Sequence, residues 1–452
     1  ILMILALAGT ATLGLVFPIS IAIVILLAIV TISYEQTIHA YPNGGGAYIV
    51  ARDNMGELPA QIAGAALLTD YILTVAVSIS SGMAQIVSAF PGLYEYRVAI
   101  AVMLILFVML VNLRGVREAG LTFAIPSYFF ILMMSLSVGF GMVRFVTGNL
   151  STVIDPPELE VIQTITMVTP FLILHAFSSG TAALTGIEAI SNGITAFKEP
   201  RSRNAGITLI WMACILGTLF LGISFLSSQI HAIPSEFETV ISQMGRTVFD
   251  GKGVLYLALI AATSIILIMA SNTSFAGFPR LGALLAQDGF LPRQMAFKGS
   301  RLVYSYGIVS LTIIAILLVI VFNASVTGLI PLYAIGVFMS FTLSQAGMAR
   351  RWWKIGRLKP GAQMIERGST LQYERGWQSK MVINGFGAIC TFVVMMVFAI
   401  TKFIDGAWVV LILIPLLVVM FTSIHAHYRG IAQRLSLEKY AAMPRITPYE
   451  DR

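Results

Sequence analysis

The sequence predicts an all-helical integral membrane protein. Of the 452 residues, 57% are hydrophobic and only 11% are charged, and the mean hydropathy is +0.87. Soluble domains carry about 25% charged residues. Apolar runs of about 20 residues, the length needed to cross the hydrocarbon of a bilayer, recur along the whole chain. We therefore expect one continuous helical bundle, a multi-pass protein of the plasma membrane.

Eleven apolar runs define the expected spans. The chain also opens on "ILMILALAGTATLG", which is apolar from its first residue and lacks the basic start of a signal peptide. We interpret this stretch as the remnant of a truncated first helix. The eleven visible spans are expected at about 15–39, 59–90, 96–113, 121–148, 168–196, 205–229, 253–276, 304–322, 327–349, 381–401 and 406–426.

The basic residues of the loops predict the orientation of these spans. Alternate loops are rich in Lys and Arg, most densely in 350–359, whereas the loops between them are sparse in basic residues and carry several acids. Basic loops lie on the cytoplasmic side. The alternation runs without a break through the expected spans, so it supports their number. It also places the C-terminal segment in the cytoplasm.

Composition excludes several functions. The net charge of +7 comes from short loops rather than from one basic patch with interleaved aromatic residues, so nucleic acid is not an expected partner. The motifs HExxH and GxSxG are absent from the sequence, and we expect no enzyme activity and no cofactor. The two cysteines, Cys214 and Cys390, fall within apolar runs and suggest neither a disulfide framework nor a thiol metal site.

Asp70 is the first residue that should not lie in lipid. It follows Pro59, the expected cytoplasmic start of its helix, by about eleven residues and therefore lies about 16 Å deep. An ionisable residue at that depth is by default a functional hypothesis. Thr74 and Ser78 follow at a spacing of four residues, which places three oxygens on one helix face beside Tyr71. Such oxygens suit a hard cation; the alternative is a structural hydrogen bond or a subunit interface.

Glu188 is the second acidic residue expected at mid-membrane. It belongs to "SSGTAALTGIEAISNGITAFKEP", whose three glycines and several hydroxyl residues make a poor regular helix. Broken helices are the means by which transporters expose backbone dipoles to a substrate. Counted back from Phe197, Glu188 lies about 13 Å from the cytoplasmic face, a depth similar to that of Asp70. The alternative is that the glycines only permit close helix packing.

Two further motifs leave their roles open. Gly44, Gly45 and Gly46 follow the first visible span and predict a sharp reversal, which is either a gating hinge or a plain re-entrant turn. In "IPLYAIGVF", a proline and a glycine flank Tyr333. This tyrosine is a candidate hydroxyl ligand or aromatic gate, and core packing explains it as well.

Five motifs together resemble the KimA-type potassium/proton symporters, a branch of the amino acid-polyamine-organocation (APC) superfamily. They are "AYPNGGGAY", "LLTDYILTVAVS", "AALTGIEAISNG", "ASNTSFAGFPRLGALLAQDGFLPRQ" and "IPLYAIGVF". The resemblance covers most of the chain. It implies a LeuT-like fold of two inverted five-helix repeats followed by two more helices, of which this chain shows all but the first span.

The resemblance also implies a site. Potassium in that family is bound between the first, third, sixth and tenth spans. Glu188 matches a family glutamate and is the candidate for proton coupling, and Ser78 is a further candidate for ion binding. By motif match, the potassium ligands in this chain are Asp70, Tyr71, Thr74, Thr185 and Tyr333.

The sequence departs from the family at both ends. The first span, which brings another acidic residue and a tyrosine to the ion, is absent apart from the remnant at Ile1, and the cytoplasmic domain that responds to a cyclic dinucleotide is also absent. We therefore expect an incomplete ion site and no built-in regulator. The expected parts are a transport core (1–349), a cytoplasmic loop (350–380), two additional transmembrane helices (381–427) and a cytoplasmic tail (428–452).

The leading hypothesis is uptake of potassium driven by proton entry. The alternative is an amino acid or amine permease, in which Asp70 would bind an ammonium group and helix N-termini would hold a carboxylate. A channel is disfavoured because no filter motif such as TVGYG occurs. Membrane lipid and a small cation or amino acid are the expected partners, and the sequence leaves a homodimer open.

Overall fold

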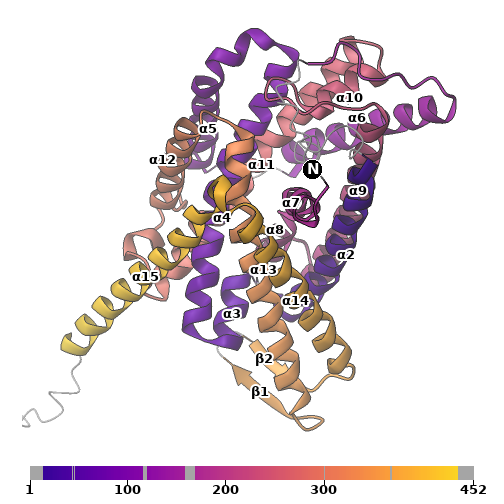
Figure 1. The fold of residues 1–452 in the computed structure, drawn as a ribbon. Helices are drawn as coiled ribbons and strands as arrows, with labels where there is room; N and C mark the ends of the chain where they lie inside the picture. The colour runs from indigo at the N-terminus through magenta and orange to yellow at the C-terminus, as the bar shows by residue number, and fades with distance from the viewer. Residues whose placement is uncertain are drawn as a thin grey trace, which may run out of the picture.

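The protein is a bundle of long, closely packed helices (Figure 1). The computed structural model describes residues 14–435 except 43, 45, 116–119, 158–167, 300 and 367–368. Within these residues, ten helices are long and apolar enough to cross a membrane, and α12 (Ser305–Val321) is shorter but equally apolar. The ten are α2 (Val16–Ala40), α4 (Glu57–Ala89), α5 (Arg97–Leu113) with the turn η2 (Pro91–Tyr96), α6 (Gly120–Val146), the broken helix α7 (Pro170–Gly180), η3 (Thr181–Leu184) and α8 (Ile187–Asn192), α9 (Arg201–Gln229), α11 (Val254–Gln287), α13 (Val326–Gly356), α14 (Trp377–Thr401), and α15 (Trp408–Leu435) with the π-helical turn η6 (Phe403–Ala407).

All eleven predicted spans correspond to these helices, but several helices extend further than predicted. α11 continues from residue 276 to Gln287, α13 continues from 349 to Gly356, and α14 begins at Trp377 rather than at 381. Hydropathy marks where a helix leaves the hydrocarbon, whereas the backbone hydrogen bonds of the helix continue into water. The expected edges of the 350–380 loop therefore fall within helices.

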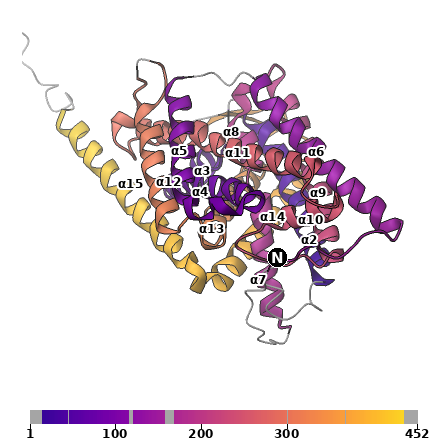
Figure 2. The same ribbon diagram turned by 90° about the horizontal axis from the view of Figure 1, so that it is seen from above.

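Two helices form the centre of the bundle. The most apolar windows of α4 and α13 are each 61% buried, whereas those of α5, α6, α9 and α15 are only 17–22% buried and face the surroundings. α4 lies against both α11 and α13. The N-terminal half of α4 is rich in small residues, Ala63 to Ala66 among them, which allow helix backbones to approach closely. Figure 2 shows the same central position of α4 and α13 from above.

The hydropathy pattern did not predict three short elements of the structure. A short helix, α3 (Ala47–Met55), follows the glycines. The strands β1 (Gln363–Glu366) and β2 (Ser369–Gln372) form an antiparallel hairpin. The helix α10 (Val240–Val248) lies on the opposite side of the molecule from this hairpin (Figure 1). The turns η4 (Ile194–Ala196) and η5 (Arg293–Ala296) also lie in connections. All are too short or too polar to register as spans.

The last helix lies at the edge of the bundle. Seen from above, α15 runs along the edge of the bundle (Figure 2), and in both views its C-terminal end projects away from the other helices (Figures 1 and 2). The hairpin and the basic end of α13 lie on one side of the bundle, which the basic loops identify as cytoplasmic. The loop from His231 to Thr239 and α10 therefore lie on the outer side.

Candidate functional site

The predicted break in the helix that carries Glu188 is present. α7 tightens into η3, the backbone becomes extended at Thr185 (φ −64°, ψ 146°), and Gly186 adopts a left-handed conformation (φ 97°) before α8 begins. A residue with a side chain rarely adopts such a φ, so the glycine permits the break. The break places Thr185 and Glu188 on two short segments rather than on one regular helix.

Asp70 lies in the middle of α4 with one oxygen unpaired. Its Oδ1 atom is inaccessible to solvent and, among the described residues, has no hydrogen-bond partner. Within the described ranges, this carboxylate takes part in no ion pair. The side chain of Thr74 is its hydrogen-bonding neighbour on the same helix. An unpaired buried carboxylate is costly. The position therefore favours a positive partner.

Hydroxyl groups from three helices meet beside Asp70. Thr74 Oγ1 donates a hydrogen bond to Tyr333 Oη of α13 over 3.1 Å, and Thr185 of the broken helix also interacts with Tyr333. Tyr333 is only 7% exposed. Thr185 Oγ1 donates to the carbonyl of Ala182 as well (2.9 Å). The structure thus brings together four of the predicted ligands on α4, α13 and the break between η3 and α8.

A glycine allows α13 to reach this position. A Cβ atom built on Gly336 would lie 2.9 Å from the carbonyl oxygen of Ala66 and 3.6 Å from the backbone nitrogen of Asp70. The first distance is closer than real Cβ contacts, so only glycine fits without a shift of the backbone. α13 and α4 therefore touch at the helical turn that carries the carboxylate.

Tyr71 and Ser78 are placed differently. The Tyr71 hydroxyl accepts a hydrogen bond from Asn192 Nδ2 at the end of α8 (2.9 Å), and its ring packs against Gly277 of α11. Tyr71 therefore joins α4 to α8, and its hydroxyl already has a partner. Ser78 lies two turns beyond Asp70 on α4 and is partly buried.

Glu188 is buried and doubly hydrogen-bonded. It is 7% exposed, its Oε1 accepts from the backbone amide of Ala47 over 3.0 Å, and its Oε2 accepts from the hydroxyl of Ser340 on α13. Its charge is close enough to that of Asp70 for the two carboxylates to interact. The similar depth predicted for the two acids therefore corresponds to one shared region of the structure.

The glycine turn brings α3 against α8. Gly44 has a φ of +106°, and a Cβ on Gly46 would lie 1.9 Å from Asn192 Oδ1. Gly45 lies outside the described residues. Sequence reasoning found the glycines and Glu188 separately but missed Ala47, Asn192 and Ser340, which connect them. A backbone amide has no sequence signature, and "ISNG" and "FMSF" gave no local signal for the other two.

A further polar cluster joins α3 to the end of α11. Asp288, at the end of α11, accepts hydrogen bonds from the Tyr48 hydroxyl and from Arg52 Nη1, the latter over 2.9 Å. Burial lowers the pKa of Arg52, but the hydrogen bonds and charges of Asp288 and Asp53 together outweigh burial and leave that pKa raised. α3 is therefore held at one end by Glu188 and along its length by Asp288.

Comparison with known proteins identifies the family of the chain. A family profile described as amino acid permease matches residues 2–421. "Potassium transporter KimA" of Bacillus subtilis (strain 168) is 43% identical over 439 residues, which is 97% of this chain and 68% of that protein. The chain is a multi-pass protein of the cell membrane. It belongs to the amino acid permease family, within the APC superfamily, in the branch that contains KimA.

Proposed function

We propose that the chain takes up potassium ions, driven by the entry of protons. The observation that carries this proposal is the Asp70 carboxylate, whose buried Oδ1 has no partner among the described residues while hydroxyl groups converge beside it. A dehydrated potassium ion exchanges its water for such oxygens. The 43% identity to a protein named as a potassium transporter supports the choice of cation.

The predicted ligands have distinct roles in this proposal. Asp70 supplies the charge, and Thr74, Thr185 and Tyr333 supply neutral oxygens from three helices. Tyr71 and Ser78 lie on the same helix as Asp70 and complete its polar surroundings. The transported potassium ion is the substrate, and no resident cofactor enters the proposal.

Glu188 is the proposed proton site. When potassium is bound at Asp70 and a proton at Glu188, the two buried negative charges are both compensated. Protonation also removes the charge that the amide of Ala47 now faces, which weakens the attachment of α3. A proton can thus change the relative stability of inward- and outward-facing states, which is what coupling requires. The glycines 44–46 are the proposed hinge for this movement.

Rubidium uptake tests the proposal. Cells that lack their own potassium importers and produce the full-length protein should accumulate rubidium, and an inward proton gradient should increase the rate. Asp70→Asn should abolish uptake, whereas the matched control Glu57→Gln, an exposed acid at the cytoplasmic start of α4, should leave it unchanged. Unchanged uptake in Asp70→Asn would refute the role of Asp70.

The amino acid or amine permease is the competing outcome of the same assay. If amino acids or amines, rather than potassium, compete with the transported substrate and exchange across the membrane, Asp70 binds an ammonium group instead. Saturable flux that depends on the proton gradient would separate a transporter from a channel.

A further inference from the structure

A cavity of about 280 Å³ opens on the outer side of the bundle. It lies between the outer end of α4, the start of α5, the loop before α10 and the start of α13. Polar side chains make up much of its lining. Those used in the argument below are Ser80, Ser81, Gln85, Arg97, Glu236 and Thr327.

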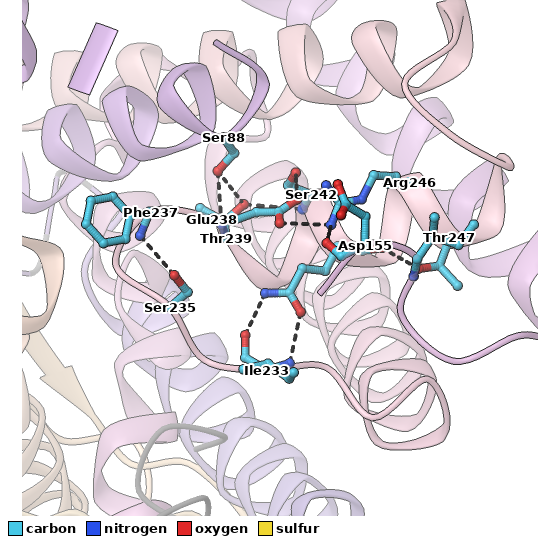
Figure 3. A network of polar contacts seen from close by, with 12 residues as sticks. Ser88, Asp155, Ile233, Ser235, Phe237, Glu238, Thr239, Ser242, Arg246 and Thr247 are labelled. Atoms are coloured by element: carbon cyan, nitrogen blue, oxygen red, sulfur yellow. Dashed lines mark hydrogen bonds and ion pairs between the residues drawn. The ribbon is translucent and has the colours of Figure 1, made fainter. Parts of the chain in front are cut away.

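The wall of this cavity is held in place by a hydrogen-bond network (Figure 3). The amide of Thr239 donates to Ser88 Oγ over 2.9 Å, and the Thr239 hydroxyl donates to Gln85 Oε1 over 2.9 Å. The neighbouring buried pair of Glu238 and Arg246 (3.0 Å) anchors the same loop to α10. The loop that carries Glu236 is therefore tied to the outer end of α4.

The cavity lies above Asp70 on the same face of α4. Thr74, Ser81 and Gln85 follow Asp70 by 4, 11 and 15 residues, which at about 100° per residue keeps all three within about 60° of Asp70 around the helix axis. At about 1.5 Å per residue, Ser81 is about 16 Å further out than Asp70. The polar side chains of Thr74, Ser81 and Gln85 therefore lie on the face of α4 that carries the central carboxylate, and Ser81 and Gln85 line the cavity at its outer end.

Two observations point to a cation in the cavity. Ser80 is 1% exposed, yet its Oγ atom has no hydrogen-bond partner within the described part of the chain. Glu236 at the mouth is exposed, and its Oε1 accepts from the Thr327 hydroxyl over 2.9 Å. Together these residues offer one carboxylate and several neutral oxygens.

Arg97 is the positively charged residue of the cavity lining. Its guanidinium group is hydrogen-bonded to backbone carbonyl groups. Its Nε donates to the carbonyl of Asn323 (3.0 Å), its Nη1 donates to that of Tyr94 (3.1 Å), and its guanidinium lies 4.0 Å from the centre of the Tyr94 ring. Arg97 thus braces the rim, and its charge disfavours a divalent ion beside a single carboxylate. Because Arg97 and Glu236 leave the lining without net charge, the neutral oxygens and the single carboxylate can hold a monovalent cation only weakly.

We propose that the outer cavity binds a monovalent cation, here potassium, before it moves along α4 to Asp70. This inference rests on the proposed function for the identity of the ion. It adds Glu236, Ser80 and Ser81 as residues of a second, outer site, none of which belongs to the predicted ligand set.

Protection of an introduced cysteine tests the outer site. Cys214 and Cys390 are first replaced by serine, and Ser81→Cys is then treated from outside with a membrane-impermeant thiol reagent. Potassium chloride should slow the modification about tenfold at ten times its half-protecting concentration, whereas the same concentration of N-methylglucamine chloride should not. Thr327→Cys at the mouth provides a second reporter if Ser81→Cys does not fold.

Three variants separate the explanations. Protection should persist in Asp70→Asn, because the outer site does not need the central one. Glu236→Gln should raise the half-protecting concentration about two- to fivefold, the range expected of a partly solvated charge. The control Glu95→Gln, an exposed acid outside the cavity lining, should not change it.

Each remaining outcome is decisive. Equal protection by N-methylglucamine, loss of protection in Asp70→Asn, or protection by a zwitterionic amino acid but not by potassium would overturn the outer site. If protection holds while rubidium uptake is absent, the proposed function fails and the outer site stands. If uptake is normal and protection is absent, only the outer site fails.

Discussion

The backbone amide of Ala47 donates a hydrogen bond to the Glu188 carboxylate over 3.0 Å. Ala47 is the first residue of α3, so an acid of the broken helix lies at the positive end of another helix's dipole. The second oxygen of Glu188 accepts from Ser340 of α13. One carboxylate therefore joins three helices, and its charge contributes to each contact.

Substitution of Glu188 should separate its structural role from its charge. In Glu188→Gln, the amide oxygen can still accept from Ala47, so the fold should persist while rubidium uptake loses its dependence on the proton gradient. In Glu188→Ala, both donors lose their acceptor, and the protein should be destabilised by about 1–3 kcal/mol. Thermal unfolding in detergent and uptake at several external pH values measure the two effects. A Glu188→Gln protein with normal pH dependence would remove Glu188 from the coupling mechanism.

Gly46→Ala should weaken the contact between α3 and α8. The new Cβ would lie 1.9 Å from Asn192 Oδ1, so the Asn192 side chain must rotate and give up its hydrogen bond to Tyr71. Because a side chain can move, we expect a moderate loss of about 1–2 kcal/mol and a lower uptake rate. Gly139→Ala on the exposed face of α6 has nothing within 4 Å and is the matched control. Equal unfolding temperatures for the two variants would contradict the close approach of Gly46 to Asn192.

The sequence predicted the helices well because hydropathy over about 20 residues is a local signal. It also placed Asp70 and Thr74 together, since a spacing of four residues fixes their relation on a helix. Tyr333 could be joined to them only through family resemblance, because it is 259 residues from Thr74 and local spacing says nothing about such a pair. The contact between Ala47 and Glu188 could not be predicted from local spacing either, because these residues are 141 positions apart.

Short elements were missed for a different reason. The hairpin sequence "QMIERGSTLQ" contains a glycine between two short alternating segments, which is a weak hairpin signal. It lies within a basic stretch whose charge predicts only a loop. α3 has nine residues, too few to show an apolar period, and its position depends on contacts with Glu188 and Asp288 rather than on its own sequence.

Gly336→Ala should be more damaging than Gly46→Ala. The added Cβ would lie 2.9 Å from the carbonyl oxygen of Ala66, which belongs to the backbone of α4 and cannot rotate away. α13 must therefore move, and Tyr333 moves with it from Thr74. We expect a loss of about 2–3 kcal/mol and a higher KM for rubidium, measured in proteoliposomes. Gly385→Ala in α14, which has nothing within 4 Å, should show neither change; a normal KM in Gly336→Ala would contradict this packing.

Tyr48→Phe should weaken the contact between α3 and Asp288 equally at every physiological pH. Burial raises the pKa of Tyr48 above its usual value near 10, and the hydrogen bond to Asp288 raises it further. A group whose folded pKa is raised contributes stability that is fully present below its unfolded pKa, so the hydroxyl remains a donor throughout pH 6 to about 9. Loss of this donor to a charged acceptor should cost about 1–3 kcal/mol. The difference in unfolding temperature between wild type and Tyr48→Phe should therefore stay constant over that range, and a difference that shrinks as the pH rises would show that Tyr48 is not the donor to Asp288.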